Sequence, residues 1–462
     1  MVGRLRRAGL LSLLLAAVIT AFATGACSTS DGAAGGSGET PPTSDPGASG
    51  DAAANGADAR TQTEGGATAD ADTDATTKAD GGPGSACADA GPFGGRTFVT
   101  KTTTFVIVAG GVYEDLIVTS PDSDSPAIEV STTAPVVIRH VRGSGPGDFV
   151  HAGGGSDVTI ENSVYVTTTA TRDNARRGRF YAAASPKNVV IEHCEMEHTS
   201  GIEVQSFSGD GSAAQTVRVR YCDAREIDGR YRNGGSQFQD FVGLSAGNRA
   251  SAEIAYNRIV TTPGQGRAED NITMYKNGGT AARPYHVFRN YIEGSFQDAY
   301  LDDQTTGTAI NADGDGATSD ADFPQYGIWE ENVATGGAAI NIAVGRHMRV
   351  NRNTVVSVGK NRFGTRYRSG NAGISFFNYI GSPLYGDNSG DGNRILWLRD
   401  EAPVTNGSAF STTRRDVDQG GASLTNTVAL TLPYATAEKT AYDDYMAMLA
   451  TAGVTLGASW CK

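Results

Sequence analysis

Three short runs between Glu269 and Gly345 decide the fold of this chain: Ile272-Thr-Met-Tyr-Lys276, Ala309-Ile-Asn-Ala-Asp313 and Ala339-Ile-Asn-Ile-Ala343. In each run apolar residues alternate with outward-pointing residues, most of them polar, and this period of two is typical of a half-buried strand. A second phrase recurs beside them, in which an apolar residue stands three places before an Asn, as in Val287-Phe-Arg-Asn290 and Val350-Asn-Arg-Asn353. A strand followed by an Asn turn, repeated along the chain, indicates a solenoid.

The second phrase can be followed over most of the chain. In its general form the phrase ends in a small or amide side chain. The residues at this final position are Val141, Ser163, Cys194, Cys222, Asn257, Asn290, Asn332 and Asn353. In a parallel β-helix one turn position stacks from coil to coil at a spacing of about 4.8 Å, so amide side chains there can hydrogen-bond in a ladder. A β-sandwich would instead have two-residue hairpin turns and no fixed stacking position. The sequence therefore predicts an all-β chain wound as a parallel β-helix.

The first 27 residues have the features of an export signal. Arg4, Arg6 and Arg7 precede an apolar run from Leu10 to Phe22, which is too short for a membrane span. Gly25-Ala-Cys27 resembles a bacterial lipobox, in which the Cys is lipidated, although Thr24 departs from the Leu that is common there. We expect a lipid anchor on Cys27, with a plain secretory signal as the alternative.

Residues 28–90 form the next segment, and it contains almost no apolar side chain larger than Ala. Such a segment cannot offset its ordering entropy, so we expect a disordered tether. It carries much of the formal net charge of −13, which leaves the remainder mildly acidic and argues against nucleic-acid binding. We expect the β-helix over residues 91–400 and a C-terminal cap over 401–462, with an amphipathic helix from Ala435 to Ala452. We expect the chain to be a monomer.

Five cysteines complete the composition. Cys87 and Cys461 stand near the two ends of the folded part, so in an oxidising, exported setting a disulfide between them is plausible, the alternative being two unpaired thiols. Cys194 and Cys222 are predicted neighbours in the turn ladder. Whether they pair stays open, because their side chains should point the same way.

Residues 98–380 resemble the right-handed parallel β-helix superfamily that contains pectate-lyase-like enzymes. More narrowly, four phrases are similar to bacterial exported β-helix-repeat proteins: Glu269-Asp-Asn-Ile-Thr-Met-Tyr-Lys-Asn-Gly-Gly279, Asn290-Tyr-Ile-Glu-Gly294, Gly314-Asp-Gly316 and Asn353-Thr-Val-Val356. The resemblance implies a right-handed coil with a polysaccharide groove along one stacked sheet. The catalytic phrases of polygalacturonases and pectate lyases are absent from the sequence.

Stacking the opening strand of each coil gathers a set of outward polar residues. The predicted substrate-binding residues are Glu203, Gln205, Thr273, Asn311, Asn341, Arg346 and His347. Amides, hydroxyls and carboxylates on one face suit the hydroxyl edges of sugars. For β-elimination, Lys276 or Tyr275 is the candidate base, with Arg267, Arg346 or bound calcium neutralising the developing charge. The alternative for Lys276 is a solvated lysine at the end of a strand.

For hydrolysis, Asp313 with Asp270 or Asp303 would supply the two carboxylates, against turn-capping roles for each. Calcium ligands are predicted at Asp313, Asp315 and Asp322, because Asn311-x-Asp-x-Asp-Gly-x5-Asp322 has the spacing of a calcium loop. The first and last positions depart from that pattern, and an Asx-rich turn is the alternative.

Two arginine-rich loops, 172–179 and 225–232, could form a clamp for an anionic glycan. The resulting hypothesis is a lipid-anchored protein of the bacterial cell envelope that binds an acidic polysaccharide and cleaves it by lyase-type β-elimination. A glycoside hydrolase is the second enzymatic option, and a non-catalytic glycan-binding or adhesion protein is the alternative from another class.

Overall fold

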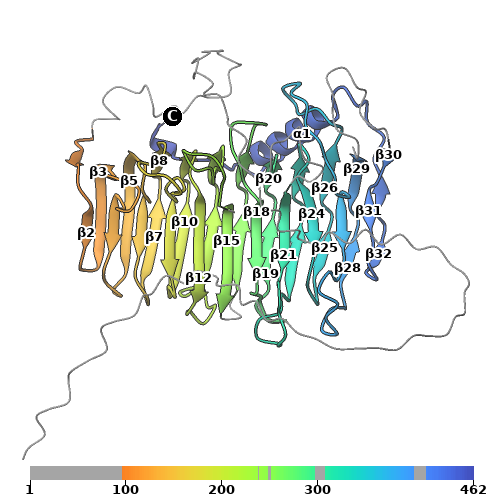
Figure 1. Ribbon diagram of the computed structural model, residues 1–462, viewed down its shortest axis with the longest axis horizontal. Helices are drawn as coiled ribbons and strands as arrows, with labels where there is room; N and C mark the ends of the chain where they lie inside the picture. Colours follow the sequence, from red (N-terminus) through yellow and green to blue (C-terminus); the bar gives the residue numbers. More distant parts are fainter. Residues whose placement is uncertain (1–95, 238, 248–250, 297–306, 400–412, 462) are drawn as a thin grey trace, which may run out of the picture. The chain divides into compact units, whose positions relative to one another are not determined.

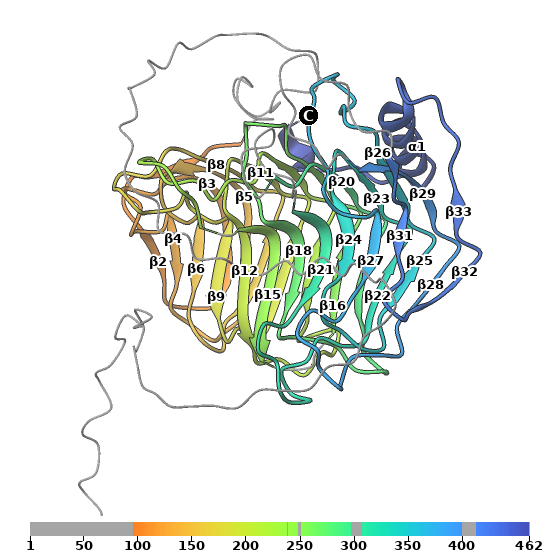
Figure 2. The same cartoon turned by 45° about the vertical axis from the view of Figure 1, so that its right-hand side comes forward.

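The computed structural model describes residues 96–237, 239–247, 251–296, 307–399 and 413–461, all within one compact unit. Their strands form two long sheets, sheet A with 22 strands and sheet B with 11. The chain passes through both sheets once per coil, and each coil stacks on the previous one (Figures 1 and 2). The chain is therefore a parallel β-helix, as predicted, and not a sandwich.

Sheet B holds one strand from each coil, and its strands follow one another in chain order (Figure 2). They are β2 (Phe105–Ile107), β4 (Ile128–Val130), β6 (Val150–Ala152), β9 (Tyr181–Ala184), β12 (Gly201–Phe207), β15 (Asp240–Gly247), β18 (Asp270–Tyr275), β21 (Thr308–Asp313), β24 (Ala339–Ile342), β27 (Ile374–Phe376) and β31 (Val417–Asp418). The three runs that suggested the fold are thus β18, β21 and β24.

Sheet A takes two strands from most coils and bends between them, so it has two rows. Row A1 contains β7 (Asp157–Glu161), β10 (Asn188–Glu192), β13 (Val217–Arg220), β16 (Ala252–Ala255), β19 (Tyr285–Phe288), β22 (Gly327–Glu330), β25 (Arg349–Asn351), β28 (Ser389–Asp391) and β32 (Ser423–Thr425). Row A2 contains β1 (Val99–Lys101), β8 (Val164–Thr167), β11 (Glu195–Glu197), β14 (Asp223–Arg225), β17 (Arg258–Val260), β20 (Tyr291–Glu293), β23 (Val333–Thr335), β26 (Thr354–Ser357), β29 (Arg394–Arg399) and β33 (Val428–Ala429). The long strands β3 (Gly111–Thr119) and β5 (Val136–Gly145) belong to both rows, and β30 (Thr413–Arg414) pairs antiparallel with β29.

The corner between the two rows is a single residue in the left-handed region. Its φ is 53° at His193, 56° at Tyr256 and 53° at Arg289. This conformation costs an L-residue about 1 kcal/mol, and the residue that follows offsets the cost with buried hydrogen bonds. That following residue is the turn position of the sequence phrase.

The predicted amide ladder is present at this corner and has one rung more than expected. Asn257, Asn290, Asn332, Asn353 and Asn393 are all fully buried. Each of the first four donates from Nδ2 to Oδ1 of the next, at 2.9 to 3.1 Å. Cys194 and Cys222 occupy earlier rungs as free, buried thiols, so they are neighbours without a disulfide.

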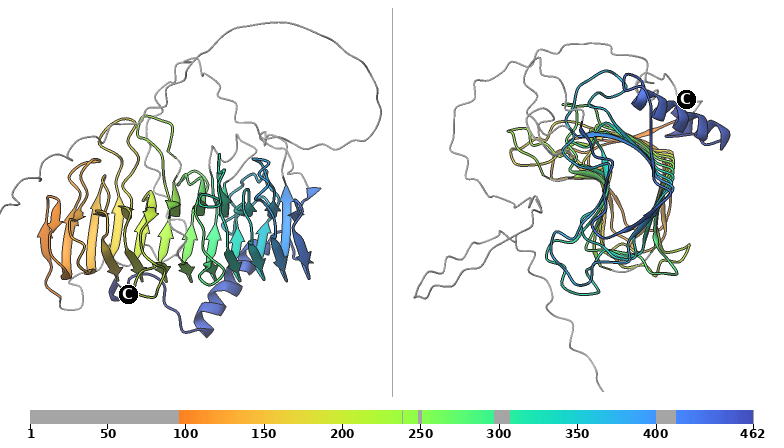
Figure 3. Two further views of the ribbon diagram at one scale, coloured as in Figure 1. Left: turned by 90° about the horizontal axis from the view of Figure 1, so that it is seen from below. Right: turned by 90° about the vertical axis from the view of Figure 1, so that its right-hand side faces the viewer.

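A C-terminal helix, α1 (Ala437–Thr451), lies outside the coil (Figure 3). It packs against β23 and β26, and Tyr445 donates its hydroxyl proton to the Asn257 carbonyl at 3.0 Å. The chain ends in a short 3-10 helix, η2 (Ser459–Cys461), whose Ser459 hydroxyl bonds Asn162 Oδ1 at 3.0 Å. The helix was predicted within two residues at each end. Among the described residues no helix is both long and apolar enough to cross a membrane.

The coils continue beyond residue 400, the end that the sequence predicts for the solenoid. β31, β32 and β33 pair in parallel with β27, β28 and β29 and so form one more coil. The predictions for the signal, the tether, Cys27 and Cys87 fall outside the described residues, and so does Asp303.

Candidate functional site

The outward side chains of sheet B stand in straight columns from coil to coil. One column runs through Glu203, Gly243, Thr273, Asn311 and Asn341, which pair in this order. The next column contains Gln205, Ser245, Tyr275 and Asp313. The predicted juxtaposition of these polar residues on one sheet is therefore confirmed.

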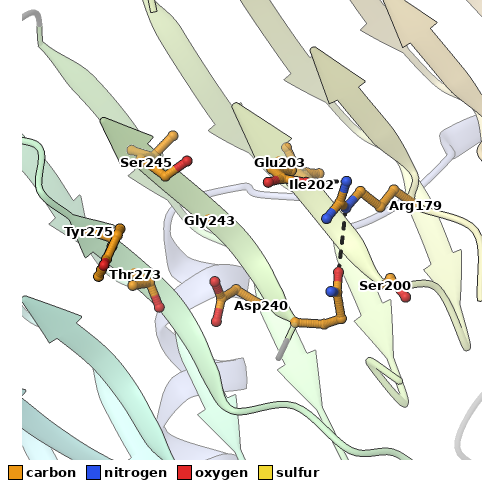
Figure 4. A pocket seen from close by; sticks show the side chains of 11 residues that line it. Arg179, Ser200, Ile202, Glu203, Asp240, Gly243, Ser245, Thr273 and Tyr275 are labelled. Atoms are coloured by element: carbon orange, nitrogen blue, oxygen red, sulfur yellow. Dashed lines mark hydrogen bonds and ion pairs between the residues drawn. The ribbon is translucent and has the colours of Figure 1, made fainter. Parts of the chain in front are cut away.

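An extra residue enters sheet B at the start of β15. Gly201 of β12 pairs with Asp240, whereas the next residue, Ile202, pairs with Val242. Phe241 is therefore the extra residue of a β-bulge, and its ring is fully buried. A bulge turns the preceding side chain out of the regular alternation. As a result Asp240 faces the outward surface of the sheet (Figure 4).

The next two strands carry the same insertion. Asp270 pairs with Thr308 and Ile272 pairs with Ile310, so β18 and β21 have the same number of residues between these two pairs and stay in register. On the far side the register shifts back, because Thr308 pairs with Ala339 while Ile310 pairs with the adjacent Ile340. Three aligned bulges, at Phe241, Asn271 and Ala309, thus present Asp240, Asp270 and Thr308 side by side.

Asp270 is held firmly at the centre of this row. Asp270 is only 6% exposed. Its carboxylate accepts hydrogen bonds from the Thr308 N–H at 2.7 Å, the Thr308 hydroxyl at 2.6 Å and Asn311 Nδ2 at 2.8 Å. Burial raises the pKa of Asp270, while the bonds from Thr308 and Asn311 oppose the rise.

Further carboxyl groups surround Asp270. Burial, followed by the charges of Asp270 and Asp240, raises the pKa of Glu269 to about 9. Burial and the charge of Asp270 also raise the pKa of Asp240 well above its usual value, and burial raises that of Asp313. These groups therefore keep their protons to higher pH than isolated carboxylic acids do, and Glu269 keeps its proton near neutral pH.

A hollow of about 80 Å³ opens beside Asp240 (Figure 4). It is lined by residues of β12, β15 and β18, among them Glu203, Gly243 and Thr273, and by Arg179 from the preceding loop. Arg179 forms an ion pair with Glu203 and donates from Nε to Gln239 Oε1 at 3.4 Å. Glu203 and Thr273 were predicted from the sequence to lie on this surface, whereas Asp240 was not.

Aromatic side chains extend the same surface toward the C-terminal coils. Phe377 and Tyr379 are 38% and 44% exposed, and their ring centroids lie 6.2 Å apart. The Tyr379 hydroxyl bonds Asp313 Oδ1 at 2.6 Å and also bonds Asp315. The aromatic pair therefore adjoins the carboxyl groups.

The predicted bases of a lyase lie at the end of β18. Lys276 has a φ of 48°, and its N–H donates to the Asp313 carbonyl at 2.9 Å. Its Nζ lies 5.3 Å from the centroid of the Tyr275 ring. Lys276 and Tyr275 are therefore beside the carboxyl groups, as expected from the register.

Two predicted substrate-binding residues are elsewhere. Arg346 and His347 lie in the turn from β24 to β25, outside sheet B. Arg346 donates from Nε to Gln325 Oε1 at 3.1 Å, and the His347 ring stacks on Tyr326 with centroids 4.6 Å apart. Both residues thus lie past the end of β24, and their role in binding a substrate stays a prediction.

The predicted calcium ligands do not share one cluster. Asp313 and Asp315 meet at Tyr379, whereas Asp322 accepts bonds from the Ser319 N–H at 2.8 Å and its hydroxyl at 2.7 Å. Within the part of the chain that the structure describes, no group of three or more His, Cys, Asp or Glu side chains is placed to hold a metal ion. Calcium binding at this loop stays a prediction.

The arginines of the proposed anion clamp all pair with carboxylates. The pairs are Arg172 with Asp124, Arg176 with Asp148, Arg177 with Asp228, Arg179 with Glu203, Arg225 with Glu197, Arg230 with Asp228 and Arg232 with Asp173. Much of their charge is therefore already neutralised within the protein.

The sequence did contain a signal for the residues that were missed. Asp240-Phe-Val-Gly-Leu-Ser245, Asp270-Asn-Ile-Thr-Met-Tyr275 and Thr308-Ala-Ile-Asn-Ala-Asp313 share a polar residue two places before the inward Val or Ile. The extra residue becomes visible only when these strands are paired with β12 and β24. Comparison with family models, with curated proteins and with solved structures found no match for the chain.

Proposed function

We propose that the chain binds a polysaccharide along the outward face of sheet B and cleaves its glycosidic bonds by acid catalysis. The observation that carries this proposal is the row of three aligned bulges, which presents Asp240 and Asp270 beside a column of polar side chains, with Glu269 close to both. Aligned β-bulges that bring several carboxyl groups together lower the stability of the fold, so they indicate a functional surface.

Glu269 is the proposed proton donor. Its pKa of about 9 keeps it protonated near neutral pH, as a group that protonates a leaving oxygen must be. Asp313, one coil further on, is the proposed carboxylate that assists from the other side of the sugar ring, either through water or directly. Asp270 supports both by its fixed position between them. Phe377 and Tyr379 offer apolar faces for neighbouring sugar rings.

The charge of this surface favours a neutral or amine-bearing glycan over the acidic polymer expected from sequence. β-Elimination from a uronate polymer remains the second candidate, because Lys276 and Tyr275 lie at the same surface. This chemistry needs a cation to neutralise the developing charge. Arg346 bonds Gln325 outside sheet B, and the loop arginines are paired with carboxylates. A place in the pectate-lyase-like superfamily is part of the proposal and rests on the resemblance of the sequence.

The test is a panel of neutral, amine-bearing and uronate polymers. We expect wild-type protein to release reducing ends, and Glu269→Gln to lower the rate at least about a hundredfold, while Glu161→Gln on row A1 leaves it unchanged. An unsaturated product that absorbs ultraviolet light and is lost in Lys276→Ala would support the lyase. Binding without any product would support the alternative of a glycan-binding or adhesion protein.

We further propose export and anchoring in the bacterial cell envelope by a lipid on Cys27, on the strength of the lipobox-like sequence. Labelling with a radioactive fatty acid tests this. The wild-type chain should take up label and sediment with membranes, and Cys27→Ser should do neither. Label on the Cys27→Ser variant would contradict the anchor.

A further inference from the structure

The hollow beside Asp240 exists because residue 243 has no side chain. In the column of outward residues, Gly243 pairs with Glu203 on one side and with Thr273 on the other. A Cβ at this position would lie 2.8 Å from Asp240 Oδ2. Every other position of the column from Glu203 to Asn341 carries a polar side chain, so the gap is local.

The walls of the hollow carry two carboxyl groups, those of Glu203 and Asp240, together with several hydroxyl groups that can accept hydrogen bonds. Thr273 is 9% exposed and lines the hollow, and its hydroxyl lies close enough to the Asp240 carboxyl to oppose the rise in the pKa of that group. The Asp240 carboxyl stands beside it (Figure 4). Arg179 is the one cation among the lining residues, and its guanidinium is engaged with Glu203 and Gln239. A guest that supplies several donors is therefore complementary.

The volume limits the guest to a substituent. A hollow of about 80 Å³ is small beside ligand pockets, which commonly measure about 300–1,000 Å³, so it suits a substituent of the glycan. A carboxylate would compete with Glu203 for the guanidinium of Arg179 and would meet no other cation among the lining residues. A primary ammonium supplies three donors and a positive charge.

We propose that the hollow at Gly243 is a specificity subsite that receives the primary ammonium group of an amino sugar within the bound glycan. This rests on the proposed function, because it assumes that a glycan lies along sheet B. It narrows the substrate to polymers with free amines, such as those built from glucosamine.

Binding at this subsite should change the number of protons that the protein holds. Asp240 is faced by Arg179, by Glu203 of β12, and by Glu269, Asp270, Thr273 and Tyr275 at β18. Burial and the charge of Asp270 raise its pKa, so it holds its proton to higher pH than an isolated carboxyl does. An entering ammonium stabilises the carboxylate and expels that proton. Binding of the amine should therefore release a proton.

Titration calorimetry tests the subsite at pH 6, in the Glu269→Gln background so that cleavage does not interfere. The probes are β-1,4-linked hexamers of glucosamine and N-acetylglucosamine and a galacturonic acid hexamer. We expect the glucosamine hexamer to bind at least about tenfold more tightly than the other two. Heats in two buffers of different ionisation enthalpy should show proton release for this hexamer.

Two variants assign the effect to the hollow. Gly243→Ala fills it and should remove the preference, whereas Gly153→Ala, where a Cβ lies 3.7 Å from the nearest atom, should keep it. Asp240→Asn should remove both the preference and the proton release without adding volume. Equal binding of amine and acetamide forms, unchanged by Gly243→Ala, would overturn the subsite and leave the cleavage proposal standing. Tightest binding of the uronate would also overturn it, and failure of every hexamer to bind would overturn both.

Discussion

Asn311 Nδ2 donates to Asp270 Oδ2 at 2.8 Å, across two neighbouring strands of sheet B and a separation of 41 residues. The contact exists because the bulges of β18 and β21 coincide. Without them Asp270 would follow Ile272 toward the core, where a carboxylate is costly to bury. The bulges therefore convert a would-be core position into a surface carboxyl.

Asn311→Ala should destabilise the protein by about 1–3 kcal/mol, because one oxygen of the buried Asp270 carboxylate loses its donor. Chemical denaturation measures this. Asn341→Ala, the next rung of the same column, is the matched control and should have a smaller effect. Equal losses would mean that the Asp270 contact has no special energetic role.

Stability should decrease as the pH rises from 4.5 to about 9, the ordinary and folded pKa values of Glu269. Between these values the folded protein holds a proton that the unfolded chain has lost, so each step up in pH favours unfolding. The melting temperature of Glu269→Gln should fall less steeply over this range. Glu161→Gln should retain the wild-type slope, and a Glu269→Gln profile that coincides with wild type would contradict the assignment.

Asn332→Ala should cost more than about 3 kcal/mol, because it removes an acceptor for the Asn290 N–H and Nδ2 and a donor to Asn353. Asn351→Ala on β25 removes an amide of the same size that is not in the ladder. Denaturation of the two variants should separate them clearly. A mild effect at Asn332 would show that the coils hold without a continuous ladder.

Phe377→Ala should weaken glycan binding roughly tenfold by removing one stacking face. Phe363→Ala is the control, since Phe363 is also exposed but packs under Arg362 in the loop after β26. Affinity for a hexasaccharide measures both. A larger loss with Phe363 would move the binding surface away from sheet B.

The ladder was predictable because one spacing, an apolar residue three places before an amide, repeats with little variation. Asn393 was missed for a physical reason: Gly390 stands at its apolar position. Leu424 of the next coil fills the space, since a Cβ on Gly390 would lie 2.7 Å from Leu424 Cδ2. The core is thus filled at this coil by a side chain from the next coil and not by the residue three places before the Asn.

The site was less predictable than the ladder. Strict alternation places Thr273, Asn311 and Asn341 correctly, but it assigns Asp240 to the core, because a bulge is invisible until neighbouring strands are paired. Alternation also fails at strand ends. Past the end of β24, Arg346 forms a parallel bridge with Gln325 and His347 turns the chain with a φ of 55°, which no count of residues along β24 would reveal.

The central claim is that a glycan lies along the outward face of sheet B, and its most direct test is a crystal structure of Glu269→Gln with a glucosamine hexamer. We predict that the hexamer crosses β12 to β27, with an amine beside Asp240 and a ring against Phe377. A hexamer bound to sheet A, or at the helix α1, would contradict the account.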